Sequence, residues 1–439
     1  MLSLPILLLS FIPSAIAAPP TSDTFNILSF NVAGLPAILN SNDVPGDKTT
    51  NTATIGQKFS QYNFSVIHVQ EDFNYHATLY ANDDHPYRTA TSGGVPFGSG
   101  LNTLSNFDWI DFERIKWDVC SDASSSDCLT PKGFTFMRVK VSEGVLVDFY
   151  NLHADAGTEP QDITARASNL QQVSTYISQF STGNPVLVFG DTNSRYTRTG
   201  DIPQIFSSQN QMTDPWVQLS LAGVAPTPGT DALLCDNPST TTACETVDKV
   251  WYRGSPALTL TATRFQYAGN MFLQANGSIL SDHNPVLVNF EWSSSEKLRV
   301  SDPYGGPHGT YFNDLPSLST VSSPTVSSIT LRGGNRLDAV SLTLSTGQTF
   351  SHGGTGGTAS TLTLNSGEKL VEAEVCQGKY NDQTRVFYMG VTTSSGRSIS
   401  AGKKTSECVV RSAESGWGIV GFVGRSGDEV DRVGFIYGK

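Results

Sequence analysis

Side chains that bind metals or move protons stand at the ends of five short apolar runs in this chain. They comprise amides, carboxylates and imidazoles: Asn31, Glu71, His153, Asp191, Asn193, Asp282 and His283. Taken singly, each is more often a turn former, a helix cap or a hydrogen-bonded surface group. Independent turns would not be expected to deliver only such groups at five strand ends, so the pattern predicts one catalytic site.

Hydrolysis of a phosphodiester, the reaction that the chain's resemblance to a known family implies, would use this set of residues. The phosphodiester is anionic and resists water, so a catalyst needs a hard cation, a group that activates water and a donor for the leaving oxygen. Magnesium keeps several waters and needs only one or two carboxylates. We therefore expect Glu71 as the principal ligand with Asn31 supporting it, and Mg²⁺ as cofactor, with Mn²⁺ or another divalent cation as the alternative. Neutral amides such as Asn31 and Asn193 can donate to phosphate without neutralising the metal.

The apolar runs alternate with helix-like stretches from Phe25 to about Trp292, which is an α/β pattern. The predicted buried strands are Phe25–Phe30, Val66–Val69, Phe134–Val141, Val145–Leu152, Val186–Phe189, Val250–Tyr252 and Val286–Phe290. Apolar residues at helical spacing predict an amphipathic helix from Asp162 to Phe180, packed on the sheet.

The first residues are typical of a secretory signal peptide. An uncharged apolar stretch from Leu2 to Ile12 precedes Pro13 and small residues up to Ala17. The stretch is shorter than the roughly 20 apolar residues that a membrane anchor needs. We expect residues 1–17 to be a leader and the mature protein to be secreted. Two sequons, at Asn63 and Asn276, agree with a secreted glycoprotein.

Six cysteines, an even number, favour disulfides in a secreted protein. Fifteen pairings are formally open. Sequence spacing favours two disulfides that each close a short loop, Cys120–Cys128 and Cys235–Cys244, and one that spans a longer segment, Cys376–Cys408.

Charge and composition divide the chain. Residues 1–300 hold 16 Lys and Arg against 28 Asp and Glu, whereas residues 301–439 hold 12 of each, so the whole net charge of −12 lies in the first part. An acidic catalytic part repels a polyanion at long range. A polar Pro/Gly segment marks a junction, and the residues beyond it alternate β-formers with turn residues, which predicts an all-β domain. We expect a catalytic domain over 18–292, a linker over 293–301 and a second domain over 302–439.

Six motifs in order resemble the endonuclease/exonuclease/phosphatase superfamily over roughly residues 24–292. They are SFNVAGLP with Asn31, HVQEDF with Glu71, NLHADAG with His153, GDTN at 190–193, VDKVWY with Asp248, and SDHNPV at 281–286. The resemblance implies a four-layer sandwich of two packed β-sheets flanked by helices. Segments DCLTPKGF at 127–134 and TARAS at 164–168 are further similar to secreted neutral sphingomyelinases of the bacterial type. The segment VPFGSGLNTLS departs from the family, which has an apolar strand with a Ser-Lys ending there.

The same resemblance implies roles for the site residues. Asp191 and Asn193 would orient the attacking water and the scissile phosphate. His153 and His283 would contact phosphate oxygens or move protons. Asp282 would support the site, and Asp248 would pair with an imidazole, which raises the pKa of that imidazole. Whether Asp191 or His283 is the general base stays open.

Three functions remain at this point. The first is a phospholipase C-like hydrolase that splits a sphingolipid or phospholipid head group, and the acidic balance favours it. The second is a secreted nuclease resembling deoxyribonucleases, with the same site. The third is a non-catalytic carbohydrate-binding protein. The presence of every expected catalytic group argues against it. Contact with a membrane surface stays open, and we expect no stable protein partner.

The C-terminal part resembles a jacalin-like lectin, which implies a β-prism of three small antiparallel sheets that binds glycans. GTYFND at 309–314 looks like its start, and GFVGRSGDEVDRVG at 421–434 is similar to its closing hairpin and sugar loop. Sugar hydroxyls suit a fixed carboxylate and exposed backbone N–H groups. The resemblance places the sugar site at Gly309, Gly427, Asp428, Glu429 and Asp431. Such a domain would raise the enzyme concentration at a glycan-coated cell surface or wall.

Overall fold

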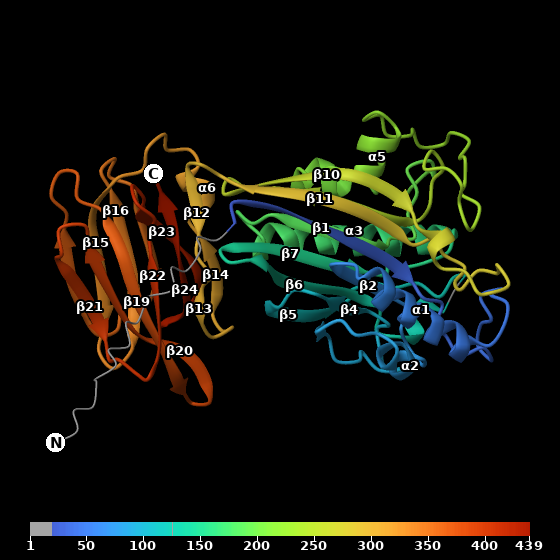
Figure 1. The fold of residues 1–439 in the computed structure, drawn as a ribbon, viewed down its shortest axis with the longest axis horizontal. Helices are drawn as coiled ribbons and strands as arrows, with labels where there is room; N and C mark the ends of the chain where they lie inside the picture. The colour runs from blue at the N-terminus through green and yellow to red at the C-terminus, as the bar shows by residue number, and fades with distance from the viewer. Residues whose placement is uncertain (1–19, 125) are drawn as a thin grey trace, which may run out of the picture.

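The structure is a computed structural model that describes residues 20–124 and 126–439. An N-terminal α/β region and a C-terminal all-β region lie end to end (Figure 1). The predicted leader, residues 1–17, lies outside the described residues. Among the helices of the described ranges, none has the length and apolar character that a membrane crossing requires.

Two β-sheets form the centre of the N-terminal region. The six-stranded sheet has the order β10-β11-β1-β2-β4-β3, and the five-stranded sheet has the order β5-β6-β7-β8-β9. The first contains β1 (Ser22–Asn31), β2 (Val66–Gln70), β3 (Tyr87–Arg88), β4 (Asn102–Ser105), β10 (Leu258–Tyr267) and β11 (Val286–Ser294). The second contains β5 (Trp109–Lys116), β6 (Gly133–Ser142), β7 (Val145–Leu152), β8 (Val186–Asp191) and β9 (Asp248–Arg253). Each of the predicted strands is therefore present.

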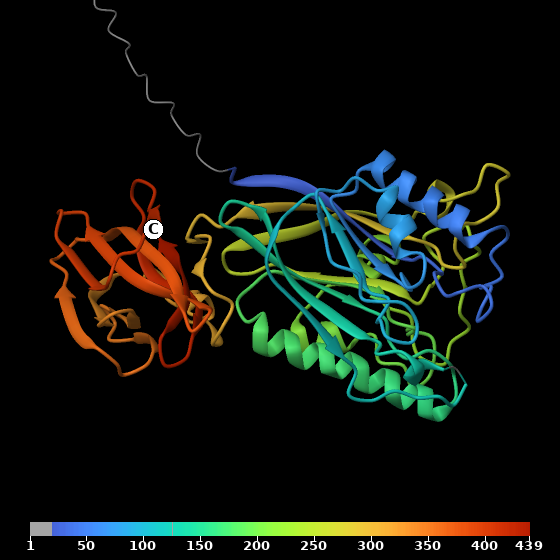
Figure 2. The ribbon, with the colours of Figure 1, turned by 90° about the horizontal axis from the view of Figure 1, so that it is seen from below.

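The two sheets pack face to face, and helices cover their outer faces. Ile27 of β1 and Leu187 of β8 belong to one fully buried cluster between the sheets. Helix α3 lies outside the five-stranded sheet, and α1 and α2 lie outside the other (Figure 2). The helices are α1 (Lys48–Tyr62), α2 (His76–Ala81), α3 (Pro160–Phe180), α4 (Ile205–Asn210) and α5 (Pro215–Ser220), with short 3₁₀ turns η1 (Asp127–Leu129) and η2 (Gly269–Met271). This arrangement confirms the predicted four-layer sandwich and the helix ending at Phe180.

Strand direction explains why distant polar residues meet. Strands β1 and β2 run parallel, with Asn31 beside Gln70, so both end at the same edge. Strands β7 and β8 also run parallel, and a bridge continues the pairing to His153 and Asp191. The antiparallel strand β9 begins there, with Asp248 beside Asp191. One edge of the sandwich therefore collects the polar strand ends.

Three antiparallel sheets form the C-terminal region, which confirms the predicted all-β prism. The first contains β12 (Leu298–Val300), β13 (Tyr304–Gly305), β14 (Thr310–Asn313), β23 (Gly418–Ser426) and β24 (Val430–Gly438). The second contains β15 (Val326–Gly333), β16 (Leu337–Leu344), β17 (Thr349–Gly353) and β18 (Thr358–Thr363). The third contains β19 (Leu370–Tyr380), β20 (Gln383–Thr393), β21 (Ser398–Gly402) and β22 (Glu407–Ser412). Apolar residues of all three meet in one core, and a single turn, α6 (Leu315–Leu318), packs against it.

The three predicted disulfides are present. Cys120–Cys128 and Cys235–Cys244 close short loops of the N-terminal region. Cys376–Cys408 joins the neighbouring strands β19 and β22.

A buried group of charges joins the two regions. Asp111 of β5 accepts from Arg432 of β24 at 2.8 Å, and its other oxygen lies 3.6 Å from Arg138 and 3.7 Å from Arg425. The ring of Tyr311, in β14, lies 4.4 Å from the Arg138 guanidinium. All four charged side chains are buried. Buried charged side chains of both regions therefore contact each other at the junction.

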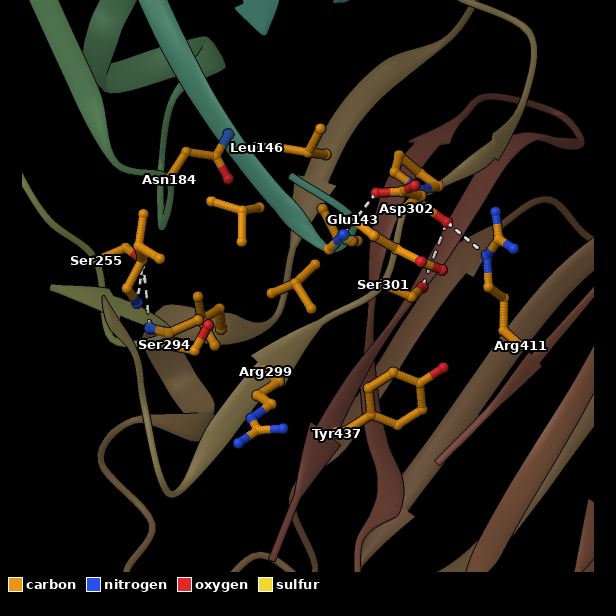
Figure 3. Close-up of a pocket in the computed structure, with 18 of the residues that line it drawn as sticks. Glu143, Leu146, Asn184, Ser255, Ser294, Arg299, Ser301, Asp302, Arg411 and Tyr437 are labelled. Atoms are coloured by element: carbon orange, nitrogen blue, oxygen red, sulfur yellow. Dashed lines mark hydrogen bonds between the residues drawn. The ribbon is translucent and has the colours of Figure 1, made fainter. Parts of the chain in front are cut away.

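A cavity of about 250 Å³ lies beside this group (Figure 3). Both regions line it, with Glu143 and Leu146 on one side and Arg411 and Tyr437 on the other. Asp302 crosses the junction, because its Oδ1 accepts from the backbone N–H of Gly144 at 2.8 Å. Residues 295–297 connect β11 to β12, which already pairs with β24.

Candidate active site

One oxygen of Asp191 is the meeting point of the polar strand ends. Asn31 Nδ2 donates to Asp191 Oδ2 at 3.1 Å and to Glu71 Oε1 at 3.2 Å. The Nε2 atoms of His153 and His283 lie 3.5 Å and 3.8 Å from the same Asp191 oxygen. Residues far apart in the chain thus form one compact group, in which the Asn31 amide connects Glu71 to the carboxylate that both imidazoles approach.

The turn after β8 holds Asp191 in place. The backbone N–H of Asn193 donates to Asp191 Oδ1 at 3.0 Å, and the Asn193 side chain donates to the Ala154 carbonyl at 3.0 Å. Asn193 has a φ of +49°, a left-handed conformation that asparagine tolerates better than most residues. Asn193 therefore positions Asp191 and ties this turn to the residue after His153.

His283 and Asp248 form a hydrogen-bonded pair. His283 Nδ1 lies 2.8 Å from Asp248 Oδ2. Burial disfavours the charged ring, but the carboxylates of Asp248 and Asp191 outweigh it and raise the pKa of His283 well above its usual value. Burial also raises the pKa of Asp248, to about 6. The two carboxylates therefore favour the charged form of the His283 ring, whose Nε2 lies 3.8 Å from Asp191 Oδ2.

Asp191 itself stays ionised. Its burial acts to raise its pKa, yet the charges of His283 and His153 and the hydrogen bonds from Asn193 and Asn31 bring the pKa below the usual value. A carboxylate at this position can accept a proton from water at neutral pH.

Glu71 has the properties of a cation ligand. Burial raises the pKa of its carboxyl, and its Oε2 is buried with no hydrogen-bond donor among the described residues. A buried carboxylate oxygen without a donor is costly unless a cation meets it. Asp191, Asp248 and His283 also bring ligand atoms within 4.8 Å of one another, although Asp248 and His283 already bond each other. Glu71, with Asn31 beside it, therefore fits a divalent cation better.

Asp282 lies at the rim of the group and not inside it. Its side chain is exposed, and its Oδ2 accepts from Asn42 Nδ2 at 3.1 Å. The preceding Ser281 hydroxyl donates to the carbonyl of Asn31 at 2.6 Å. The SDHN segment is thus fastened to the end of β1, which brings His283 to the site.

Lys132 belongs to the site although the sequence did not mark it as a site residue. Its ammonium lies 3.1 Å from His153 Nε2 and pairs with Asp127. Burial, followed by the charge of Lys132, lowers the pKa of His153 to about 4, so this ring is neutral near pH 7. The DCLTPKGF segment was the available signal, but nothing in its spacing indicated that Lys132 reaches His153.

The predicted sugar loop lies far from these residues, at the end of β23 and β24. Asp431 accepts from Arg385, and Glu429 Oε2 accepts from Arg336 Nε at 2.6 Å. A Cβ at Gly309, where φ is +74°, would stand 2.3 Å from Asp431 Oδ2, so the close approach requires glycine. The remaining loop residues, Gly427 and Asp428, are exposed. The two acidic side chains thus have arginine partners within the chain, which the sequence did not indicate.

Comparison with known proteins agrees with the division of the chain into an N-terminal α/β region and a C-terminal all-β region. Residues 45–223 match the model of Endonuclease/Exonuclease/phosphatase family 2, and residues 301–436 match the Jacalin-like lectin domain. A sphingomyelinase of Mycobacterium bovis is 37% identical over 278 residues, which are 62% of this chain and 53% of that protein. The chain thus spans about half the length of the curated sphingomyelinases it matches.

Two further similarities cover single regions. Horcolin of Hordeum vulgare is 30% identical over 139 residues, which are 30% of this chain and 92% of horcolin. The crystal structure of humanized D. rerio TDP2 aligns with 61% of this chain and 98% of its own, at 16% identity and a TM-score of 0.45. The chain thus contains an endonuclease/exonuclease/phosphatase family 2 domain at residues 45–223, followed by a jacalin-like lectin domain at residues 301–436.

Proposed function

We propose that the chain is a secreted, Mg²⁺-dependent phosphodiesterase of the sphingomyelinase or phospholipase C type. Residues 18–292 would form the catalytic domain, and residues 302–439 would bind glycans. The observation that carries the proposal is the meeting of His153 and His283 on one oxygen of Asp191, beside the buried carboxylate of Glu71. The likeness to mycobacterial sphingomyelinases over 62% of the chain supports the substrate class.

In this proposal each side chain of the site has a separate role. Glu71 and Asn31 would hold the Mg²⁺, which neutralises charge on the phosphate oxygens when it is bound. Asp191, ionised at neutral pH, accepts a proton from the attacking water. His283, held as an imidazolium by Asp248, donates to a phosphoryl oxygen as negative charge develops there. Asn193 keeps the carboxylate of Asp191 in position.

Lys132 and His153 would contact the phosphate and the leaving oxygen. The ammonium of Lys132, 3.1 Å from His153 Nε2, would donate a proton to the leaving oxygen as the bond between that oxygen and phosphorus breaks. A neutral His153 accepts a hydrogen bond at this nitrogen and keeps the Lys132 ammonium aimed at the site. Loss of either side chain would remove a positive charge, or its alignment, from the anionic transition state.

A nuclease with the same site is the second candidate, and charge separates the two. All of the net charge of −12 lies in residues 1–300, so the catalytic part repels a polyanion. A zwitterionic lipid head group has no such long-range cost. The phosphodiester of a choline-type lipid is therefore the better substrate for this surface.

The test is a substrate panel with and without chelator. We expect Mg²⁺-dependent release of the phosphorylated head group from sphingomyelin and no nicking of plasmid DNA. His153→Ala and His283→Ala should each abolish turnover, whereas His76→Ala should not, because His76 pairs with Asp72 outside the group. Near-wild-type turnover in either of the first two variants, or activity that survives EDTA, would refute the proposal.

The lectin domain would hold the enzyme at glycan-coated surfaces. Tethering raises the local enzyme concentration without new catalytic contacts. The loss of glycan-array binding in Asp431→Ala would support the sugar site at Gly309 and 427–431. An array on which the wild-type protein binds no glycan would remove this part of the proposal.

A further inference from the structure

A loop closed by a disulfide is joined to the segments that carry both His283 and Asp248. We call residues 235–244 the disulfide loop, because Cys235 and Cys244 link its two ends. The loop contacts the residues around His283, and its last residue stands shortly before Asp248 in the chain. It is therefore placed to fix these two partners relative to each other.

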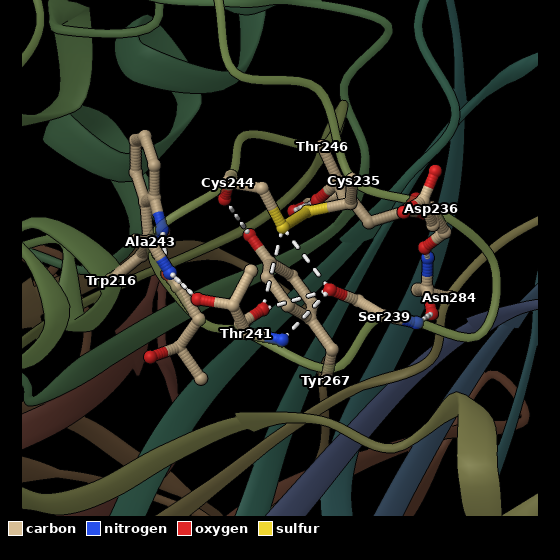
Figure 4. Close-up of a disulfide and its surroundings, with 12 residues drawn as sticks. Trp216, Cys235, Asp236, Ser239, Thr241, Ala243, Cys244, Thr246, Tyr267 and Asn284 are labelled. Atoms are coloured by element: carbon tan, nitrogen blue, oxygen red, sulfur yellow. Dashed lines mark hydrogen bonds between the residues drawn. A yellow bond between two sulfur atoms is a disulfide. The ribbon is translucent and has the colours of Figure 1, made fainter.

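Asn284, the residue after His283, binds the disulfide loop with both ends of its side-chain amide. Its Nδ2 donates to the carbonyl of Asp236 at 2.8 Å, and its Oδ1 accepts from the backbone N–H of Ser239 at 3.0 Å (Figure 4). Asn284 is only 5% exposed. Because both polar ends of the amide are bonded to one loop, the amide has a single orientation, and the backbone next to His283 is held with it.

The disulfide loop also bonds the segment that precedes His283. Asn237 Nδ2 donates to the carbonyl of Ser281 at 2.8 Å. The Ser281 hydroxyl in turn accepts from the backbone N–H of His283 at 3.2 Å. His283 is thus held by residues on both sides of it, Ser281 and Asn284, and both of these residues are bonded to the disulfide loop.

The other end of the loop leads directly into β9, which begins at Asp248. The hydroxyl of Tyr267 donates to the carbonyl of Cys244 at 2.9 Å, and Cys244 is buried (Figure 4). Two residues further on, the Thr246 hydroxyl donates to the carbonyl of Asp248 at 3.0 Å. The chain is therefore fixed in place on its way from the disulfide to Asp248.

Close packing leaves the Asn284 amide little freedom. Gly269 lies against it, since a Cβ there would stand 2.6 Å from Asn284 Oδ1 and 2.9 Å from the Cβ of Pro238. Truncation of Asn284 would leave one carbonyl and one N–H of the loop without their partner, which is costly for groups shielded from water. We therefore expect the loop and the segment around His283 to move apart when this amide is removed.

The contact between His283 and Asp248 has little tolerance for such a movement. His283 Nδ1 lies 2.8 Å from Asp248 Oδ2, and the opposite ring nitrogen lies 3.8 Å from Asp191 Oδ2. A displacement of the ring by about 1 Å would lengthen the first contact beyond hydrogen-bond range and can cost on the order of a hundredfold in rate.

We propose that Asn284 is a positioning residue of the active site, which holds the His283 ring against Asp248 by way of the disulfide loop. The inference rests on the proposed function for the reaction and adds what keeps the imidazole in place. Asn284 acts through its neighbour, because its own polar atoms are bonded to the loop.

The experiment measures two quantities on the full chain carrying Asn284→Ala. On a small soluble phosphodiester at saturating Mg²⁺, we expect kcat to fall roughly tenfold or more, with KM within about threefold of the wild-type value. In NMR titrations with EDTA and without substrate, the pKa of His283 should fall by about one unit, because the ring loses its charged hydrogen bond to Asp248. The titration of His85, whose ring bonds Asp83 and the carbonyl of Phe64, should not change.

Two further variants complete the comparison. Asn270→Ala is the matched control, because the exposed Asn270 donates its amide to the carbonyl of Ser239 in the same loop, at 3.4 Å. We expect wild-type kcat and a wild-type His283 titration for this control. Should Asn284→Ala not fold, Cys235→Ser with Cys244→Ser opens the loop while leaving Asn284 in place, and the same two changes are expected.

The outcomes separate positioning from stability and from the reaction itself. The proposal requires both changes, so either one alone, or neither, in a wild type that hydrolyses the substrate would overturn it. The same changes in Asn270→Ala, or loss of the circular dichroism of the fold in both Asn284→Ala and the double cysteine variant, would also overturn it. A wild type that leaves the phosphodiester intact, while Asn284→Ala lowers the pKa of His283, would refute the proposed function and leave the positioning role standing.

Discussion

Replacing Asp248 by asparagine tests the electrostatic reasoning about the site most directly. The change keeps the shape of the side chain but removes the charge that lies 2.8 Å from His283 Nδ1. A hydrogen bond to a charged group contributes about 1.5–3 kcal/mol, and each 1.36 kcal/mol of barrier is a tenfold change in rate. If the bond acts fully in the transition state, Asp248→Asn should lower kcat/KM roughly 10- to 150-fold.

The pH dependence of activity should differ between the wild type and Asp248→Asn in a defined direction. In the wild type, Asp248 takes up a proton as the pH falls through about 6, and the charged hydrogen bond that holds the His283 ring in place is then lost, so activity should decrease below that pH. At the alkaline end, His283 stays charged well beyond the usual imidazole range. In Asp248→Asn the acid limb near pH 6 should disappear, and the alkaline limb should move to lower pH because the pKa of His283 falls.

The assay is the pH profile of kcat/KM on a small soluble phosphodiester at saturating Mg²⁺. Asp214→Asn is a suitable control, since that buried aspartate caps α5 and contacts none of the site residues named above. A variant with the wild-type pH profile and a rate within threefold of wild type would show that the Asp248–His283 pair does not govern the charge of the ring.

Three more predictions concern the cation, the second imidazole and the junction. Glu71→Gln should raise the Mg²⁺ concentration for half-maximal activity by an order of magnitude or more, measured by titration after chelation. Lys132→Met should raise the pKa of His153 above about 4, which NMR titration of the ring would show. Asp111→Asn leaves the buried guanidinium of Arg432 without its carboxylate and should cost about 3–5 kcal/mol, seen as a lower unfolding temperature by calorimetry. Unchanged metal dependence, ring titration or unfolding temperature would contradict the respective assignment.

Strands and strand ends were predictable because their signals are local. An apolar run such as Val186–Phe189 is buried on both faces, and the polar group that follows it marks the edge of the sheet. Once parallel neighbours end at one edge, residues such as His153 and Asp191 must approach each other. The sequence therefore predicted which residues gather, because each strand end could be recognised without knowing its neighbours.

The contacts that depend on long-range geometry were not predictable in this way. Lys132 reaches His153 because β6 and β7 pair in one particular register, which no local pattern specifies. Asp282 has the same sequence signal as His283, yet it turns outward to Asn42. Exposed apolar side chains were equally unpredictable, since an exposed Ile38 and a buried isoleucine give the same signal in the sequence, and only the fold decides between them.

The contacts at the junction hold the catalytic domain and the lectin domain in one relative orientation. An apolar interface could slide by small steps, but the hydrogen bonds from Arg432 to Asp111 and from Gly144 to Asp302 cross the junction and form in only one arrangement. Buried ion pairs add little net stability, because desolvation offsets most of their attraction, so their effect here is on orientation. Tyr311 reinforces it by stacking on Arg138 from the lectin side. If the lectin domain binds glycans as proposed, a bound glycan would orient the catalytic mouth as well as tether it, and Asp111→Asn should weaken that orientation before it affects the chemistry at Asp191.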